Sequence, residues 1–192
     1  MFLLRPLHRR RHHRGERGAV AVEAALVTPL LVVLVFGIIE FGFIFKDWLA
    51  VTSSVRAGAR IASAEPRNTS FATDAAAQVA REGSALNMDD VEALWVYEAS
   101  PDGFPAGTGS FDDCTTCVKF SWNEATQTFD PSAGSWEAID HNACTDDTGH
   151  DSVGVYLAME HDAITGLFFD SLGLSSHTVM SFEPIPTSQG CK

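Results

Sequence analysis

The apolar residues divide the chain into an amino-terminal part with helical periodicity and a carboxyl-terminal part with strand periodicity. Residues 24–45 are almost entirely apolar and contain one charged side chain, Glu40. Twenty-two helical residues extend over roughly 33 Å, which matches the hydrocarbon thickness of a bilayer. This segment therefore predicts a single transmembrane helix.

The helix is expected to continue past the apolar stretch as an amphipathic stalk. Apolar side chains recur there at intervals of three and four residues, which places them on one face: Trp48, Val51, Val55, Ala59 and Ala62. Pro66 ends the helix, because a proline excludes the residue before it from the α region. We therefore expect one helix over 19–65, a turn over 67–70, and a second, alanine-rich helix over 71–82 with Gly83 as its cap.

From residue 91 the pattern changes to an alternation of apolar and polar positions, which is typical of strands. The expected strands are 91–99, 117–123, 153–162 and 176–183. Segments 100–113 and 130–151, rich in Gly, Pro, Asp and Ser, are expected to be loops, and 166–173 a hydrophobic loop or short helical turn. We predict an α+β fold in which a small antiparallel sheet packs with one apolar face on a long amino-terminal helix.

Charge separates the amino terminus from the rest of the chain. Residues 1–18 carry six arginines and one acid, a net +5, whereas the remainder carries 7 basic and 24 acidic side chains, a net −17. A basic segment directly before an apolar span is typical of a cytoplasmic flank. We predict no nucleic-acid partner, because no later segment combines basic and aromatic residues. The expected organisation is a basic cytoplasmic leader (1–18), a transmembrane helix (19–45), a helical stalk (46–83) and an extracytoplasmic head (84–192).

The junction between leader and span carries the most specific motif. The leader ends at Gly18, the apolar helix begins at Ala19, and Glu23 follows five residues after the glycine. An acidic side chain at the centre of a membrane helix costs about 2.5–3.5 kcal/mol on insertion scales, and less near an end. Glu23 is therefore expected to have a compensating partner.

This junction resembles the class III signal of type IV prepilins, in which a peptidase cuts after the glycine. The resemblance implies a cut between Gly18 and Ala19. It also implies that the new amino terminus can pair with Glu23 of a neighbouring subunit in a filament, which would offset the burial of that charge.

The pattern continues as G-A-x-A-x-E, then Pro29 within the apolar run, then Glu40 followed by Gly42. It resembles the amino-terminal region of TadE-like proteins of the tight-adherence (Tad/Flp) pilus system. The resemblance implies a pilin-like fold and a minor pilin or pseudopilin held in the bacterial inner membrane. The implied partners are a prepilin peptidase, other pilin-like subunits, the inner-membrane assembly platform and the lipid bilayer. Glu23, Pro29 and Glu40 would then serve assembly or recognition by the peptidase. For Glu40, a side chain that reaches the membrane interface and a helix–helix contact are both open.

Four cysteines, Cys114, Cys117, Cys144 and Cys191, lie in the part expected outside the cytoplasm, where disulfides form. Four cysteines allow three connectivities. A bond between Cys114 and Cys117 would be tight, so we favour a pairing of each with Cys144 or Cys191. The alternative is a zinc site of the form C-x2-C…H-x2-C that includes His141, or a C-x-x-C redox pair.

Histidine and aspartate also occur side by side at His150–Asp151 and His161–Asp162. No nucleophile motif accompanies them, so they are interpreted as polar residues of loops and strand edges. No phosphate-binding or dinucleotide-binding motif is present in the sequence. We therefore expect no enzyme activity, no cofactor and no metal. The rival functions are an uncleaved single-span binding or sensor domain and a membrane-tethered metal or redox enzyme.

Overall fold

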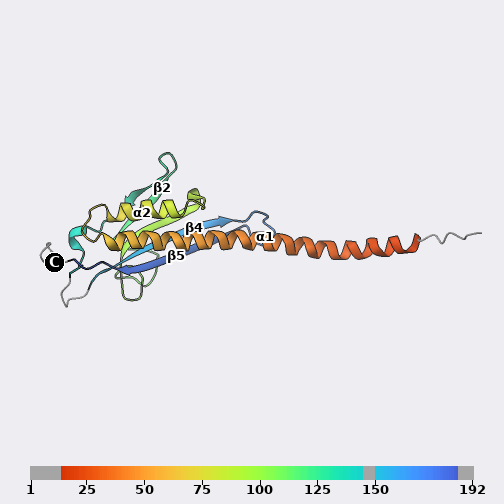
Figure 1. The fold of residues 1–192 in the computed structure, drawn as a ribbon, viewed down its shortest axis with the longest axis horizontal. Helices are drawn as coiled ribbons and strands as arrows, with labels where there is room; N and C mark the ends of the chain where they lie inside the picture. Colours follow the sequence, from red (N-terminus) through yellow and green to blue (C-terminus); the bar gives the residue numbers. More distant parts are fainter. Residues whose placement is uncertain (1–13, 145–149, 186–192) are drawn as a thin grey trace, which may run out of the picture.

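The computed structural model describes residues 14–144 and 150–185. A very long helix lies along one side of a five-stranded sheet and extends far beyond it (Figure 1). The elements are α1 (Arg14–Ala64), α2 (Phe71–Glu82), β1 (Val91–Ala99), β2 (Cys117–Asn123), β3 (Thr128–Ala133), β4 (Ser152–Asp162) and β5 (Ser171–Ser181), with short 3-10 turns at Met88–Asp90 and Ala138–Asp140.

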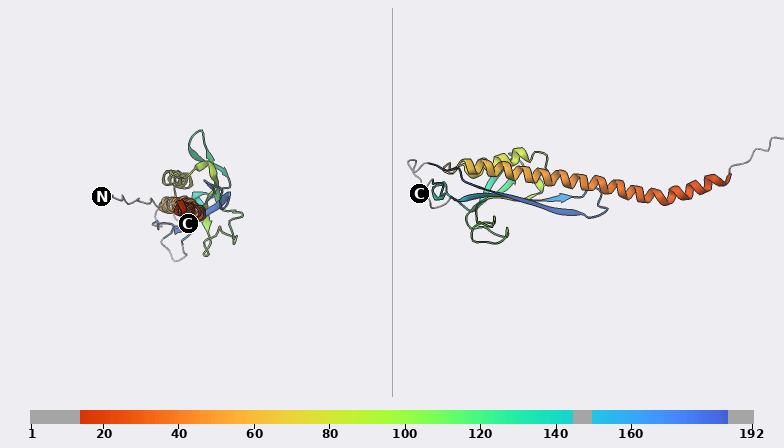
Figure 2. Two further views of the ribbon diagram at one scale, coloured as in Figure 1. Left: turned by 90° about the vertical axis from the view of Figure 1, so that its right-hand side faces the viewer. Right: turned by 60° about the horizontal axis from the view of Figure 1, so that its bottom comes forward.

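The sheet is antiparallel throughout, in the order β3-β2-β1-β4-β5. Leu94 of the central strand lies opposite Phe120 on one side and Leu157 on the other. All three side chains are buried and form a cross-strand row on the face that the helices cover. Seen along the long axis, α1 and α2 lie on the same side of the sheet (Figure 2).

The second half of α1 supplies the centre of this core. Val51, Val55, Ala59 and Ala62 have no solvent exposure, as their spacing predicts. Gly58 lets α2 approach closely, since a Cβ at this position would lie 2.6 Å from Cγ2 of Val79. The predicted stripe is wrong at Trp48, which is 45% exposed, because Asp47 occupies the inward position one residue earlier.

A smaller cluster covers the opposite face of the sheet. Trp95 and Tyr97 alternate with the inward residues of β1 and pack with Cys114 and Cys117. The ring of Phe111, from the loop between β1 and β2, stacks on Tyr156 of β4 at 4.1 Å between centroids. The β1–β2 loop is thus part of the packed structure on this face.

The predicted α+β class is confirmed, and α2, β1 and β2 have the predicted bounds. The expectation of a loop over 130–151 is wrong at its start, because β3 occupies Thr128–Ala133. This strand holds Pro131 and is mostly exposed, which an edge strand tolerates. The last strand begins at Ser171 rather than 176, and a loop over 163–170 precedes it.

Candidate membrane-proximal site

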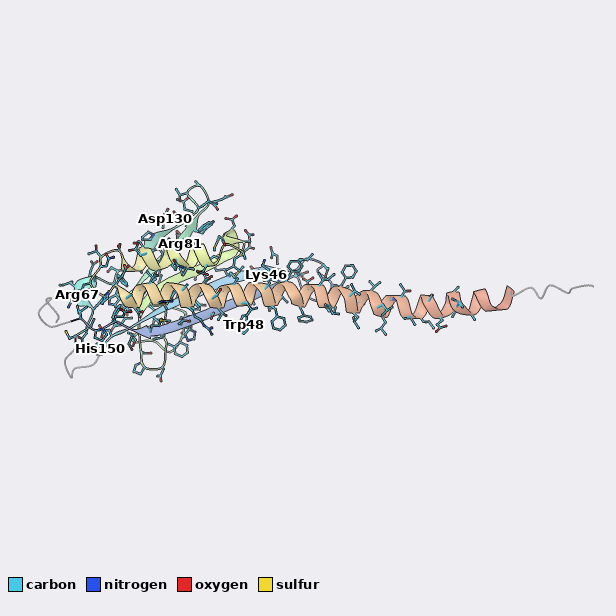
Figure 3. The ribbon with its side chains drawn as sticks, viewed as in Figure 1. Lys46, Trp48, Arg67, Arg81, Asp130 and His150 are labelled. Atoms are coloured by element: carbon cyan, nitrogen blue, oxygen red, sulfur yellow. A yellow bond between two sulfur atoms is a disulfide. The ribbon has the colours of Figure 1, made fainter. Side chains whose placement is uncertain are left out.

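The first half of α1 has an uncovered apolar surface. Within the described residues, Gly18–Ala64 is long and apolar enough to cross a membrane. Every side chain from Gly18 to Phe36 is exposed, so none of them packs into the core of the described chain. Figure 3 shows these side chains around the projecting helix. Gly18, Ala19, Glu23 and Pro29 all lie on this free part, and the helix continues through Pro29.

Glu40 marks the point where the free helix meets the head. It is 1% exposed although it lies between apolar neighbours. Its carboxylate accepts hydrogen bonds from the backbone N–H groups of Ile164 (2.8 Å) and Thr165 (3.2 Å) and from the Thr165 hydroxyl (3.0 Å). The side chain is therefore satisfied within its own chain and does not reach out to an interface. Hydrogen bonds to a carboxylate are stronger than those between two neutral groups. These three hydrogen bonds therefore hold the β4–β5 loop against α1.

A second buried acid, Asp47, lies on the same face of α1 two turns after Glu40. Asp47 is 9% exposed, and its Oδ2 lies 2.7 Å from Nδ1 of His161 near the end of β4. Lys46, labelled in Figure 3, lies with its Nζ 3.0 Å from Oδ1 of the same carboxylate. The expectation that His161 is a polar residue of a strand edge is wrong, because it is buried and its partner is Asp47. Asp162, its neighbour in sequence, lies on the exposed side of the strand.

The β4–β5 loop presents apolar side chains beside the free helix. Ile164, Leu167 and Phe168 are all about half exposed. The Phe168 ring lies over Gly37, where a Cβ would be 3.4 Å from its Cζ, and 6.4 Å from the ring of Phe41 between centroids. The apolar surface of α1 and that of the loop are therefore continuous.

The disulfide expectation needs a correction. Cys114 is bonded to Cys117, with 6.0 Å between the Cα atoms. This separation lies in the ordinary range for disulfides, so the short spacing is not too tight. The favoured pairing of each with Cys144 or Cys191 is wrong. The bond also occupies Cys114 and Cys117, two of the three thiols of the alternative zinc motif.

The other two cysteines are not joined to this pair. Cys144 is buried beside Ile185, with which it forms an isolated β-bridge, and it is itself a disulfide cysteine. Cys191 lies outside the described residues.

His141, the remaining residue of the zinc motif, has a packing role. Its Nδ1 lies 2.6 Å from the carbonyl oxygen of Pro66, and its ring packs on Phe71, Trp136 and Phe182. Burial lowers the pKa of His141 from its usual value, so the neutral ring is favoured. This cluster holds the α1–α2 turn against the segment before β4.

The structure thus brings one predicted site residue, Glu40, into a polar cluster and leaves Glu23 and Pro29 on the free helix. The sequence analysis named His161 but not its partner Asp47, and it did not name Thr165. A pattern was available for Asp47, because Glu40, Ile44, Asp47 and Val51 follow one another at intervals of four, three and four. Nothing local distinguished Thr165.

These features define an α+β protein with a long apolar amino-terminal helix whose second half packs on an antiparallel sheet. Residues 18–60 match the family model described as TadE-like protein, the family that the motif from Gly18 to Gly42 predicted for this segment. The comparison with curated proteins and that with solved structures gave no match.

Proposed function

We propose that this protein is a membrane-anchored minor pilin or pseudopilin that takes part in assembly of, or secretion through, the Tad/Flp pilus system. The match to TadE-like proteins over residues 18–60 indicates an association with Tad pili. The observation that carries the finer proposal is the uncovered apolar half of α1. An exposed apolar helix of this length has to be covered by lipid or by other helices.

A single-span topology follows from the charge of the two ends. The arginine-rich leader stays in the cytoplasm, α1 crosses the inner membrane, and the acidic head lies outside. The Cys114–Cys117 disulfide supports this orientation, since disulfides persist in oxidising compartments.

Processing by a prepilin peptidase would remove the leader between Gly18 and Ala19. Gly18 is exposed on the free part of α1. The new amino terminus would be a cation four residues from Glu23, on an exposed surface. In a packed filament, that amine and the Glu23 carboxylate of an adjacent subunit would neutralise each other within the membrane. The exposed first half of α1 would contact other pilin-like subunits and the assembly platform.

The mature amino terminus tests the proposal. Intact mass of the protein from its native membrane is expected to show a chain that begins at Ala19. Gly18→Leu should abolish the cut, whereas Gly15→Leu, a glycine in the same leader, should leave it intact. A chain that still begins at Met1 in the wild type would overturn the proposal in favour of an uncleaved single-span binding or sensor domain.

Glu23→Ala separates cleavage from assembly. If Glu23 pairs with a neighbouring subunit, the variant should be cut normally and fail to support normal piliation. Normal cleavage together with normal piliation would remove the role proposed for this residue.

A further inference from the structure

The β4–β5 loop lies at the end of the head from which the free part of α1 emerges (Figure 1). It runs from Ala163 to Asp170, and the N–H of Ala163 donates to the carbonyl oxygen of Asp170 at 2.9 Å. The six residues between them carry no charge, and Ile164, Leu167 and Phe168 expose large apolar side chains. The nearest acidic residues in sequence are Asp162, directly before the loop, and Asp170, its last residue.

The depth of the loop follows from its contacts with α1. A helix that starts at Ala19 reaches Glu40 after about 32 Å, which is close to the full hydrocarbon thickness. Phe168 packs over Gly37, one turn before Glu40, and beside Phe41. If α1 spans the membrane, the Phe168 ring therefore lies level with the outer part of the span.

Three N–H groups of the loop have acceptors within the protein, which lowers the cost of moving the loop from water to the boundary of the hydrocarbon region. A backbone N–H in hydrocarbon finds no water, so it needs a partner within the protein. The N–H groups of Ile164 and Thr165 donate to the buried Glu40 carboxylate, and that of Leu167 donates to the Thr165 hydroxyl at 3.3 Å.

We propose that the β4–β5 loop enters the outer leaflet of the bilayer beside α1, with Leu167 and Phe168 against lipid acyl chains and Glu40 holding the loop amides. The inference rests on the proposed membrane span of α1. It makes the head touch the membrane at two points, the helix and the loop. Because the head packs on the second half of the same helix, the two tilt together, and the second contact would restrict their tilt and rotation relative to the bilayer.

Quenching of tryptophan fluorescence by lipids brominated on their acyl chains tests this placement in the full chain. The background is Trp48→Phe, because Trp48 is itself exposed on α1. Trp95, Trp122 and Trp136 remain in the head, so their signal is measured in the Trp48→Phe protein and subtracted from that of each reporter variant. Three reporters are added one at a time in phosphatidylcholine vesicles: Phe168→Trp in the loop, Leu34→Trp in the span, and Ile139→Trp on the exposed far end of the head. We expect severalfold stronger quenching of the loop and span reporters than of the Ile139→Trp control. Leu167→Trp should behave like Phe168→Trp and guards against a local effect of one substitution.

The outcomes separate this inference from the proposed function. Quenching of Leu34→Trp without quenching of Phe168→Trp, with the latter open to aqueous acrylamide, would overturn the loop insertion and leave the span in place. Protection of Phe168→Trp from both quenchers would overturn it in favour of a contact with another protein subunit. A Leu34→Trp reporter that bromolipids fail to quench would overturn the span and the loop insertion together.

Discussion

The carboxylate of Glu40 accepts a hydrogen bond from the backbone of Ile164, 124 residues later in the chain, at 2.8 Å. Glu40, an acid within an apolar helix, thereby anchors a loop from the carboxyl-terminal part of the chain. This side chain links α1, at the point where it leaves the head, to the loop between β4 and β5.

Glu40→Ala should loosen the β4–β5 loop. The substitution leaves two backbone donors and one hydroxyl without their acceptor, and each lost bond to a charged group costs about 1.5–3 kcal/mol. Hydrogen exchange of the segment 163–170, measured by mass spectrometry in lipid nanodiscs, should become faster, and Glu40→Gln should give an intermediate rate. Unchanged exchange in Glu40→Ala would show that the loop holds its place without this carboxylate.

Asp47 and His161 are expected to be energetically coupled. Removing one member of a buried pair leaves the other without its partner, so each single alanine variant should unfold at lower denaturant concentration. A double-mutant cycle on the full chain in detergent micelles should give a coupling energy of about 1 kcal/mol or more. Lys46→Ala provides the control, because Lys46 is half exposed and its ion pair should contribute less than about 1 kcal/mol. Additive single and double variants would contradict the coupling.

Gly58 is required for the contact between α1 and α2. A Cβ there would lie 2.6 Å from Cγ2 of Val79 and 3.2 Å from the carbonyl oxygen of Ala75. Gly58→Ala should therefore destabilise the fold by about 1–3 kcal/mol, because overpacking forces the helices apart. Gly42→Ala in the same helix meets nothing within 4 Å and should leave the unfolding midpoint unchanged or raise it. A Gly58→Ala variant as stable as Gly42→Ala would mean that Val79 and α2 can move aside freely.

His141 should make the head less stable in mild acid. Burial lowers its pKa in the folded state below the usual value of 6.5, so the unfolded chain binds a proton first as the pH falls. The stability due to the neutral ring is complete above about pH 6.5 and declines as the pH drops towards the folded pKa. Denaturant unfolding at several pH values should show a steeper decline for the wild type than for His141→Phe, which cannot titrate. Parallel curves for the two proteins would assign the acid sensitivity to other groups.

The disulfide pairing can be read from a tryptic digest without reduction. Trypsin cuts after Arg81 and after Lys119, and it has no cleavage site between them. After Lys119 the next lysine or arginine is Lys192. The Cys114–Cys117 bond is therefore contained in the peptide 82–119, and the second bond, Cys144 with Cys191, is expected within 120–192. Two separate peptides, each 2 Da lighter than after reduction, are the expected result. A covalently linked pair of these peptides would show a crossed connectivity instead.

Local sequence patterns predicted the secondary structure correctly where it depends mainly on the residues of one segment. The alanine-rich stretch before Gly83 has the bounds of α2, and the alternation of Val118, Phe120 and Trp122 identifies β2. They failed at β3, because a short exposed strand with Pro131 pairs only after β2 offers it an edge. They also failed at Trp48, which was predicted to face the core. The neighbouring residue Asp47 faces the core instead.

The candidate site divides along the same line. The motif from Gly18 through Glu23 and Pro29 to Gly42 is contiguous, so the sequence alone was enough to indicate a TadE-like amino terminus, and the family match confirms it. The disulfide was predicted wrongly. The short spacing argued against a bond between Cys114 and Cys117, but the backbone geometry at the start of β2 allows it.

The sequence by itself determined the apolar helix, the charge asymmetry and the alternation that makes a sheet, because each depends on residues a few positions apart. Only the tertiary structure decided that Glu40 holds a loop and that Asp47 meets His161. Those contacts join residues more than a hundred positions apart, and they form only when the packing of Val51 and Val55 on the sheet brings α1 alongside the end of β4.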